Sequence, residues 1–256
     1  MSEIPKLFYD SQTRRLGPFL RGHILGFERR DAPAYSSTTG LRLLVIFVTL
    51  EFVVGPRMPI LTWLGLTPPV WLRVVLLLAT SVLAVRLWAK VSFSDIGFLP
   101  WRKWTTTEKL YFAQVVIIAN AIFLSLYSQQ LGVLQGRFGV WPAVAAIAVV
   151  EFLWGFYQEF NYRGILQTEL TRRFGGVWGP LAANIVFTLG PLHFYHLAST
   201  TPWPSTAIIL AATFCIGLFF ALIFHRTRNI WLVGVFHGIG NAYMNGAPKI
   251  ALLFAQ

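Results

Sequence analysis

Three short motifs place polar and ionisable side chains inside apolar stretches, and these residues are the first candidates for chemistry. Glu159 and Arg163 are four residues apart, a spacing that puts both on one face of a helix. His193 follows a Gly-Pro break in the next apolar stretch, and His237 and Asn241 are again four residues apart. A charged group at membrane depth costs at least a few kcal/mol, so such residues indicate a functional site by default.

These residue types suit hydrolysis. A carboxylate or a neutral imidazole can take a proton from water, and imidazole and amide N–H groups can stabilise an oxyanion. A zinc ion held by His193, His237 and a carboxylate is the alternative, but no H-E-x-x-H helix is present and the single cysteine is Cys215. Serine catalysis lacks its G-x-S-x-G turn. We therefore predict no cofactor.

Each motif taken alone also has a structural interpretation. The Glu159–Arg163 pair can staple a polar helix inside the bilayer. A histidine such as His193 can simply bond a backbone carbonyl, and His237 with Asn241 can join two helices by hydrogen bonds. Three such clusters in one chain favour a shared site over three separate structural devices.

The composition predicts that helices crossing a membrane position these groups. Of the 256 residues 55% are hydrophobic and only 12% are charged, which excludes an ordinary soluble enzyme and a disordered chain. Windows of about 20 apolar residues give the predicted spans: 41–61, 70–89, 109–128, 140–171, 177–197, 205–225 and 229–254. The last is interrupted by Gly238, Gly240, Asn245, Gly246 and Pro248. We expect an all-α, polytopic transmembrane helical bundle of about seven to eight spans.

We expect the chain to divide into a basic cytoplasmic segment 1–40, three helices in 41–138, and a core of four helices with a C-terminal tail in 139–256, which carries the motifs. Segment 1–40 has no apolar stretch typical of a cleavable signal peptide. It is predicted either to lie along the anionic inner membrane surface or to be a solvated tail.

Basic residues predict the orientation. With the N-terminus in the cytoplasm, 17 of the 21 Lys and Arg residues, Arg163 among them, fall on that side. The net charge of +11 thus serves topology and predicts no nucleic-acid partner. We expect an integral protein of a prokaryotic inner or cell membrane.

The motifs resemble those of the CPBP family of intramembrane proteases, also called the Abi or CAAX-protease family. Its pattern is E-E-x-x-x-R, F-x-x-x-H and H-x-x-x-[ND] over a four-helix core, and the resemblance covers roughly residues 139–246. Glu159 and Arg163 match the second glutamate and the arginine of the first motif, and His237 with Asn241 match the third. His193 matches the histidine of the second motif, with Leu189 where its phenylalanine is usual. His196 competes with His193 for the second motif. The resemblance implies that a glutamate and the first histidine activate water, while the last histidine and the asparagine hold the oxyanion.

The chain departs from the family pattern at Gln158, which stands where the first glutamate belongs. A glutamine amide cannot act as a general base. Pairing with Arg163 favours the charged form of Glu159, which makes it a poor substitute. Three interpretations fit: a subfamily that uses Gln158-Glu159 with Glu159 as the base, a natural pseudoprotease, or an isosteric replacement of a glutamate.

The sequence therefore predicts a glutamic-type intramembrane endopeptidase that hydrolyses a peptide bond of a membrane-associated protein or lipidated peptide. Glu159, with position 158, and His193 are expected to activate water, and Arg163 to fix the glutamate. The alternatives are an inactive CPBP-like scaffold or immunity protein, and a membrane transporter. A transporter would use intramembrane charges too, but no repeated half is evident.

Overall fold

The computed structural model of the chain describes residues 9–10, 15–16, 27, 29–54, 64–66, 68–195 and 201–253. These residues form a helical bundle, accompanied by one antiparallel pair of two-residue strands, β1 (Tyr9–Asp10) and β2 (Arg15–Leu16). The expectation of an all-α bundle is confirmed. Five helical stretches are long and apolar enough to cross a membrane: Ser37–Val54, Val70–Ala89, Thr106–Leu126, Phe138–Leu189 and Ser205–Thr227. Some residues of the predicted segments lie outside the described residues. They include residues 1–8, 11–14, 17–26 and 28 of segment 1–40, and residues 55–61 of the first predicted span.

The first half of the chain forms three long helices, two of which begin at side-chain caps. They are α2 (Ser37–Val48), which continues as η2 (Thr49–Val54), α4 (Val70–Leu83), which continues as η3 (Ala84–Ala89), and α5 (Thr106–Leu126). Ser36 accepts a hydrogen bond from the Thr39 backbone N–H, and Thr105 forms a reciprocal capping box with Glu108. These caps satisfy backbone donors that the apolar helices themselves leave unpaired. The loop 92–104 contains the short turn η4 (Trp101–Lys103).

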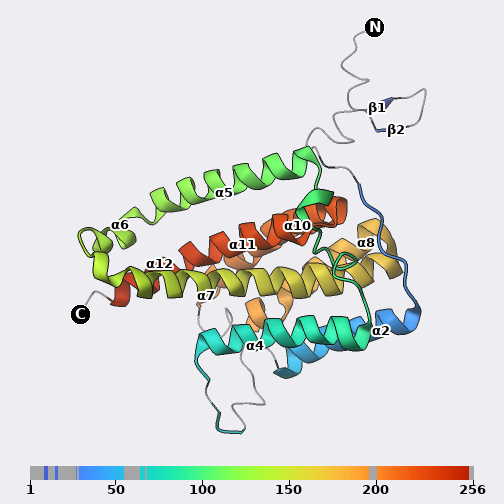
Figure 1. Cartoon of the computed structure of the whole chain (residues 1–256), viewed down its shortest axis with the longest axis horizontal. Coiled ribbons are helices and arrows are strands. Elements are labelled where there is room, and N and C mark those ends of the chain that lie inside the picture. The colour runs from blue at the N-terminus through green and yellow to red at the C-terminus, as the bar shows by residue number, and fades with distance from the viewer. Residues whose placement is uncertain are drawn as a thin grey trace.

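The second half of the chain forms the core around the motifs. Three short turns lead into it: α6 (Ser128–Leu131), η5 (Gly132–Leu134) and η6 (Phe138–Val140). The core consists of α7 (Trp141–Glu159), η7 (Phe160–Gln167), α8 (Thr168–Leu189), η8 (Pro191–Tyr195), α10 (Ser205–Thr227), α11 (Ile230–Met244) and α12 (Gly246–Leu253). α11 contacts both α7 and α5, and α10 contacts α8 (Figure 1).

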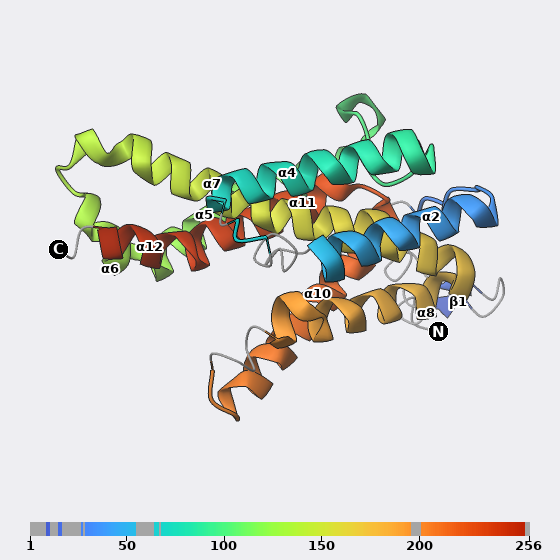
Figure 2. The same cartoon turned by 90° about the horizontal axis from the view of Figure 1, so that it is seen from below.

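The helical stretch from Phe138 to Leu189 reverses direction at Gly175, so that α8 runs back past the end of α7 (Figure 2). This glycine has φ 79° and ψ 179°, a conformation that is essentially restricted to glycine. A Cβ at Gly179 would lie 2.4 Å from the Thr171 Cα, which shows how closely the two arms pack. The predicted spans 140–171 and 177–197 are therefore two arms of one helical stretch, and the second arm ends at Leu189.

The last predicted span, 229–254, is divided in two. The interruption lies at Asn245, between α11 and α12, whereas Gly238 and Gly240 lie inside α11. Those two glycines were expected to interrupt the span, and that expectation is wrong. Gly238 serves packing instead, because a Cβ there would lie 2.6 Å from the Phe152 ring of α7.

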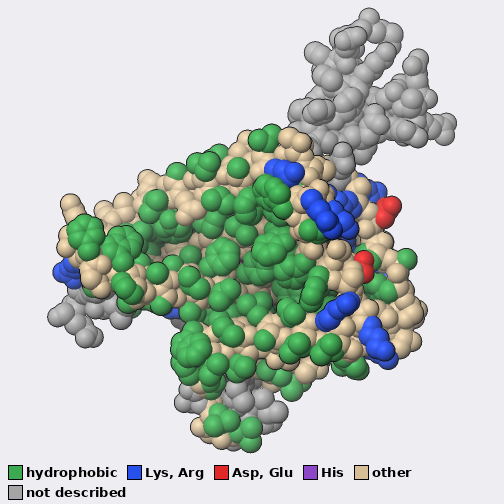
Figure 3. All heavy atoms as spheres, viewed as in Figure 1, with side chains coloured by type: hydrophobic (Ala, Val, Ile, Leu, Met, Phe, Trp, Pro, Cys, Tyr) green, Lys and Arg blue, Asp and Glu red, His purple; other side chains and the backbone are tan. Residues whose placement is uncertain are grey.

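Most of the basic side chains visible in Figure 3 gather towards one end of the bundle. Arg30 there joins three segments, because it pairs with Glu108 and donates to the carbonyls of Lys103 and Thr227. Arg228 donates to the Asp95 carbonyl at the same end. One face of the molecule shows this clustering beyond a broad apolar middle (Figure 3). It agrees with a common membrane side for these residues, and the cytoplasmic assignment of that side stays a prediction. Arg163 was wrongly counted with them, because it is fully buried in the bundle.

Candidate active site

The first motif lies where α7 changes into a π-helix. Glu159 ends α7, and η7 carries Arg163 in the following wide turn. Such π-helical turns are rare and occur frequently at functional sites. Every residue of η7 is buried, so the turn projects its polar side chains into the bundle and away from lipid.

Arg163 holds the Glu159 carboxylate from one side. The Arg163 Nε lies 3.3 Å from the Glu159 Oε2, and both side chains are fully buried. The guanidinium also donates to the Gly217 carbonyl of α10 at 2.9 Å and lies over the Phe187 ring. The predicted ion pair is therefore present, and its arginine is fixed to two further helices.

Asn184 is a site residue that the motifs did not indicate. Its Oδ1 lies 3.4 Å from Arg163 Nη2, and its Nδ2 donates to the Phe214 carbonyl at 2.9 Å. Asn184 thus connects α8, η7 and α10 behind the Glu159–Arg163 pair. Its signal in the sequence was a lone amide within the apolar stretch that ends at Leu189.

His237 holds the other side of the carboxylate. Its Nδ1 lies 2.7 Å from the Glu159 Oε1, a contact between residues 78 positions apart in the chain. The contact depends on a very close approach of α7 and α11, because a Cβ at Gly155 would lie 2.7 Å from the His237 carbonyl oxygen. Since Nδ1 faces the carboxylate, the Nε2 atom at the opposite side of the ring is left for other partners.

His193 is oriented by the backbone. Helix α8 ends at Leu189, and the Gly-Pro break leads into η8, where the His193 Nδ1 lies 2.8 Å from the Phe187 carbonyl. A carbonyl only accepts, so Nδ1 carries the proton and the neutral ring has its lone pair on Nε2. The Phe187 ring packs between the two histidines, 4.5 Å from the His193 ring and 6.1 Å from the His237 ring. The competing His196 lies outside the described residues.

Four of the six predicted site residues line a single cavity of about 750 Å³: Gln158, His193, His237 and Asn241. Glu159 and Arg163 lie behind His237, in contact with it and with each other. The sequence-predicted residues are thus brought together, although the hydrogen bond of Glu159 goes to His237 and that of His193 to a backbone carbonyl. Within the described residues, no three or more His, Cys, Asp and Glu side chains group closely enough to hold a metal ion.

The comparison with protein families locates the same region. Residues 139–243 match the family described as type II CAAX prenyl endopeptidase Rce1-like. This segment forms an Rce1-like domain. The match confirms the resemblance to the CPBP, or CAAX-protease, family. No match is found among curated proteins or among solved structures.

Gln158 lies in the wall of the cavity of about 750 Å³ and is only 7% exposed. Its side-chain oxygen is buried and has no hydrogen-bond partner in the described part of the chain. A buried amide oxygen without a partner is costly, and its presence at a cavity wall is typical of a site that meets a ligand or water. Gln158, the position at which this chain departs from the family pattern, therefore lines the same cavity as His193 and His237.

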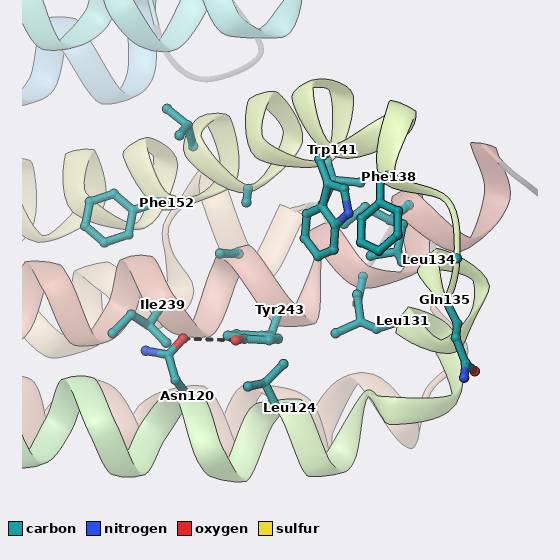
Figure 4. A pocket seen from close by; sticks show the side chains of 17 residues that line it. Asn120, Leu124, Leu131, Leu134, Gln135, Phe138, Trp141, Phe152, Ile239 and Tyr243 are labelled. Atoms are coloured by element: carbon teal, nitrogen blue, oxygen red, sulfur yellow. Dashed lines mark hydrogen bonds between the residues drawn. The ribbon is translucent and has the colours of Figure 1, made fainter.

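A second cavity lies on the other side of α11, partly within the Rce1-like domain. It has a volume of about 680 Å³ and is bounded by α5, α7, α11 and α12 (Figure 4). Its wall is almost wholly apolar, and the side chains of Trp141, Phe138 and Phe152 point into it (Figure 4). Its main polar feature is a hydrogen bond of 2.9 Å from the Tyr243 hydroxyl to the Asn120 Oδ1.

Proposed function

We propose that the chain is an intramembrane endopeptidase that hydrolyses a peptide bond in a membrane-associated, prenylated or otherwise lipidated protein. The family match supports a protease of the CPBP type, and the apolar helices support an integral membrane protein. The observation that carries the proposal is the convergence of His193, His237 and Asn241 on one cavity within the matched segment.

In this proposal His193 is the general base. Its Nδ1 donates to the Phe187 carbonyl, which leaves the Nε2 lone pair to accept a proton from water. The hydroxide equivalent formed in this way attacks the carbonyl carbon of the substrate. When the tetrahedral intermediate collapses, the C–N bond breaks and His193 gives its proton to the leaving amine. Gln158, on the same wall, orients that water through its side-chain amide.

His237 and Asn241 stabilise the oxyanion. Both belong to α11, and a spacing of four residues lets the Nε2–H of a doubly protonated His237 and the Asn241 amide N–H point to one oxygen. Glu159 accepts from the His237 Nδ1, so it orients the ring and stabilises positive charge on it, as a buried carboxylate does for other catalytic histidines. Glu159 then acts through His237, and Arg163 keeps the carboxylate in place. This chemistry uses no metal, and we expect chelators to leave the rate unchanged.

The second candidate function is an inactive, CPBP-like membrane scaffold. The specific observation in its favour is Gln158 in place of the family glutamate. Under this alternative the cavity keeps its shape and binds partners but has lost its base.

The test is cleavage of a prenylated reporter peptide by the purified chain in proteoliposomes. We expect cleavage by the chain as it stands and loss of cleavage in His193→Ala. Gln158→Glu separates the two functions, because cleavage seen only in that variant would assign the base to position 158 and make the natural chain inert. Cleavage in neither form would reject the protease. A Leu124→Met change, in the wall of the apolar cavity, is the matched control for handling and folding.

A further inference from the structure

The cavity of the candidate active site continues beyond the predicted residues as a polar stripe. His237, Asn241, Asn245 and Lys249 follow one another at intervals of four residues, and all four line the same cavity. The interval is close to one helical turn, so the stripe follows one side of α11 and passes onto α12. A peptide in a membrane needs partners for its backbone N–H and C=O groups, and amide side chains along a cavity provide them.

The stripe ends on an ion pair that the proposed hydrolysis does not use. Lys249 on α12 pairs with Glu151 on α7, and both line the cavity. The carboxylate is buried, with 7% of its side chain exposed, whereas 52% of the Lys249 side chain is exposed. The pair is thus an anchored carboxylate that holds an accessible ammonium.

An ammonium has three donors, and Glu151 occupies one of them in this structure. The two remaining donors suit a second carboxylate, in a cavity whose other walls are largely apolar. Among the described residues that line this cavity, Lys249 is the cation.

The distance along α7 sets where that carboxylate lies. Glu151 is seven residues before Gln158 on the same helix, a rise of about 10 Å. An extended peptide covers about 3.3 Å per residue, so two or three substrate residues span the gap. We propose that Lys249, held by Glu151, binds a substrate carboxylate two or three residues from the bond that is cleaved. This proposal rests on the proposed function, because it assigns the substrate to the same cavity.

Two sources offer the same chemistry: the free carboxyl terminus of the substrate and an acidic side chain. A set of prenylated peptides distinguishes them. One pair differs only in a terminal carboxylate or carboxamide, and a second pair, both ending in amides, differs only in an internal Glu or Gln. Binding to the full chain in nanodiscs is measured first, by fluorescence anisotropy, and cleavage second.

We expect one carboxylate peptide to bind about tenfold to a hundredfold more tightly than its neutral partner, as for a charged hydrogen bond. Lys249→Met should remove that preference while leaving the affinity for the neutral peptide unchanged. Lys249→Arg should keep most of the preference for the carboxylate peptide. Lys103→Met, an exposed lysine on the short turn η4 of the loop 92–104, is the matched control and should change nothing.

Removing Lys249 alone leaves the buried Glu151 carboxylate without its partner and can impair folding. The double variant Glu151→Gln/Lys249→Met removes both charges and should stay folded. It should also bind the carboxylate peptide no more tightly than its neutral partner. In cleavage, moving the carboxylate further than three residues from the bond should lower kcat/KM mainly through KM.

Equal binding of charged and neutral peptides, or a preference that survives Lys249→Met, would overturn the carboxylate site. Cleavage without any such preference would overturn it and leave the proposed protease intact. Failure of every peptide to bind or be cleaved would instead reject the substrate class, and this proposal with it.

Discussion

The two cavities on either side of α11 are nearly equal in volume and both largely apolar, but they differ in the polar side chains that line them. The apolar cavity measures about 680 Å³ and the polar one about 750 Å³. One contains a single hydrogen-bonded pair, Asn120 with Tyr243, whereas the other collects two histidines, three side-chain amides and an ion pair. Volume alone therefore does not mark the candidate active site. The candidate active site is marked instead by the convergence of polar side chains from separate helices.

One helix makes this difference. On α11, Ile239, Ala242 and Tyr243 face the apolar cavity, while His237 and Asn241 face the polar one. A helical repeat of 3.6 residues separates the two sets by direction rather than by distance along the chain. The following predictions test whether function and stability depend on the polar face alone, from the largest expected effect to the smallest.

Arg163→Met should cause the largest loss of stability. It removes the partner of the fully buried Glu159 carboxylate, which typically costs about 3–5 kcal/mol. Thermal unfolding in detergent measures the loss. The double variant Glu159→Gln/Arg163→Met leaves no unpaired charge and should lose less. An equal loss in both variants would show that the packing of Arg163, and not its charge, matters.

His237→Ala, Asn241→Ala and His193→Ala should each lower kcat at least about a hundredfold, as the loss of one oxyanion donor or of the base does. All three should remain folded, because each residue lines a cavity. Reporter cleavage in proteoliposomes gives the rates. Normal rates in the two α11 variants would show that this face of the helix does not serve catalysis.

Gly155→Ala should have an intermediate effect on both the stability and the cleavage rate. Its Cβ would lie 2.7 Å from the His237 carbonyl oxygen, so α7 and α11 must separate. We expect about 1–3 kcal/mol of destabilisation, as for overpacking. A shift of His237 away from Glu159 should also lower the rate. Gly139→Ala, where the added Cβ meets no atom within 4 Å, is the matched control and should be neutral.

Tyr243→Phe should have the smallest effect. It removes the hydrogen bond to Asn120 in the apolar cavity, worth about 1 kcal/mol. The cleavage rate should stay within twofold of the natural chain. A large fall in rate would break the contrast between the two cavities and extend the active site across α11.

Several features of the site could be predicted from local sequence. The Glu159–Arg163 pair follows from a spacing of four residues, and the side-by-side placement of His237 and Asn241 follows from the same rule. The break before His193 follows from Gly190 and Pro191. Helical spacing fixes such neighbours whatever the rest of the chain does. The boundary between the predicted spans 140–171 and 177–197 agrees with the structure, because Gly175 lies between them, shortly after Arg172 and Arg173. The end of α11 was less certain, since Asn245 interrupts the helix inside an apolar segment.

Contacts between residues far apart in the chain could not be predicted from the sequence. Nothing in the residue pattern tells that Glu159 bonds to His237, that Asn184 braces Arg163, or that Lys249 reaches Glu151. Spacing along the chain carries no information about which helices approach one another across the bundle. Close approach at Gly155 and Gly238, and the reversal at Gly175, decide those contacts.

The sequence by itself determined the class of the protein: an apolar helical bundle, its few intramembrane charges, and motifs similar to those of the CPBP family. The scarcity of charge made each buried polar residue visible, because the bilayer penalises every one of them. The tertiary structure decided which of these residues meet. It brought Gln158, His193, His237 and Asn241 to one cavity, turned Glu159 towards His237, and left a cavity of similar size with apolar walls. Helix packing determines these contacts, because it alone sets which face of α11 each neighbouring helix contacts.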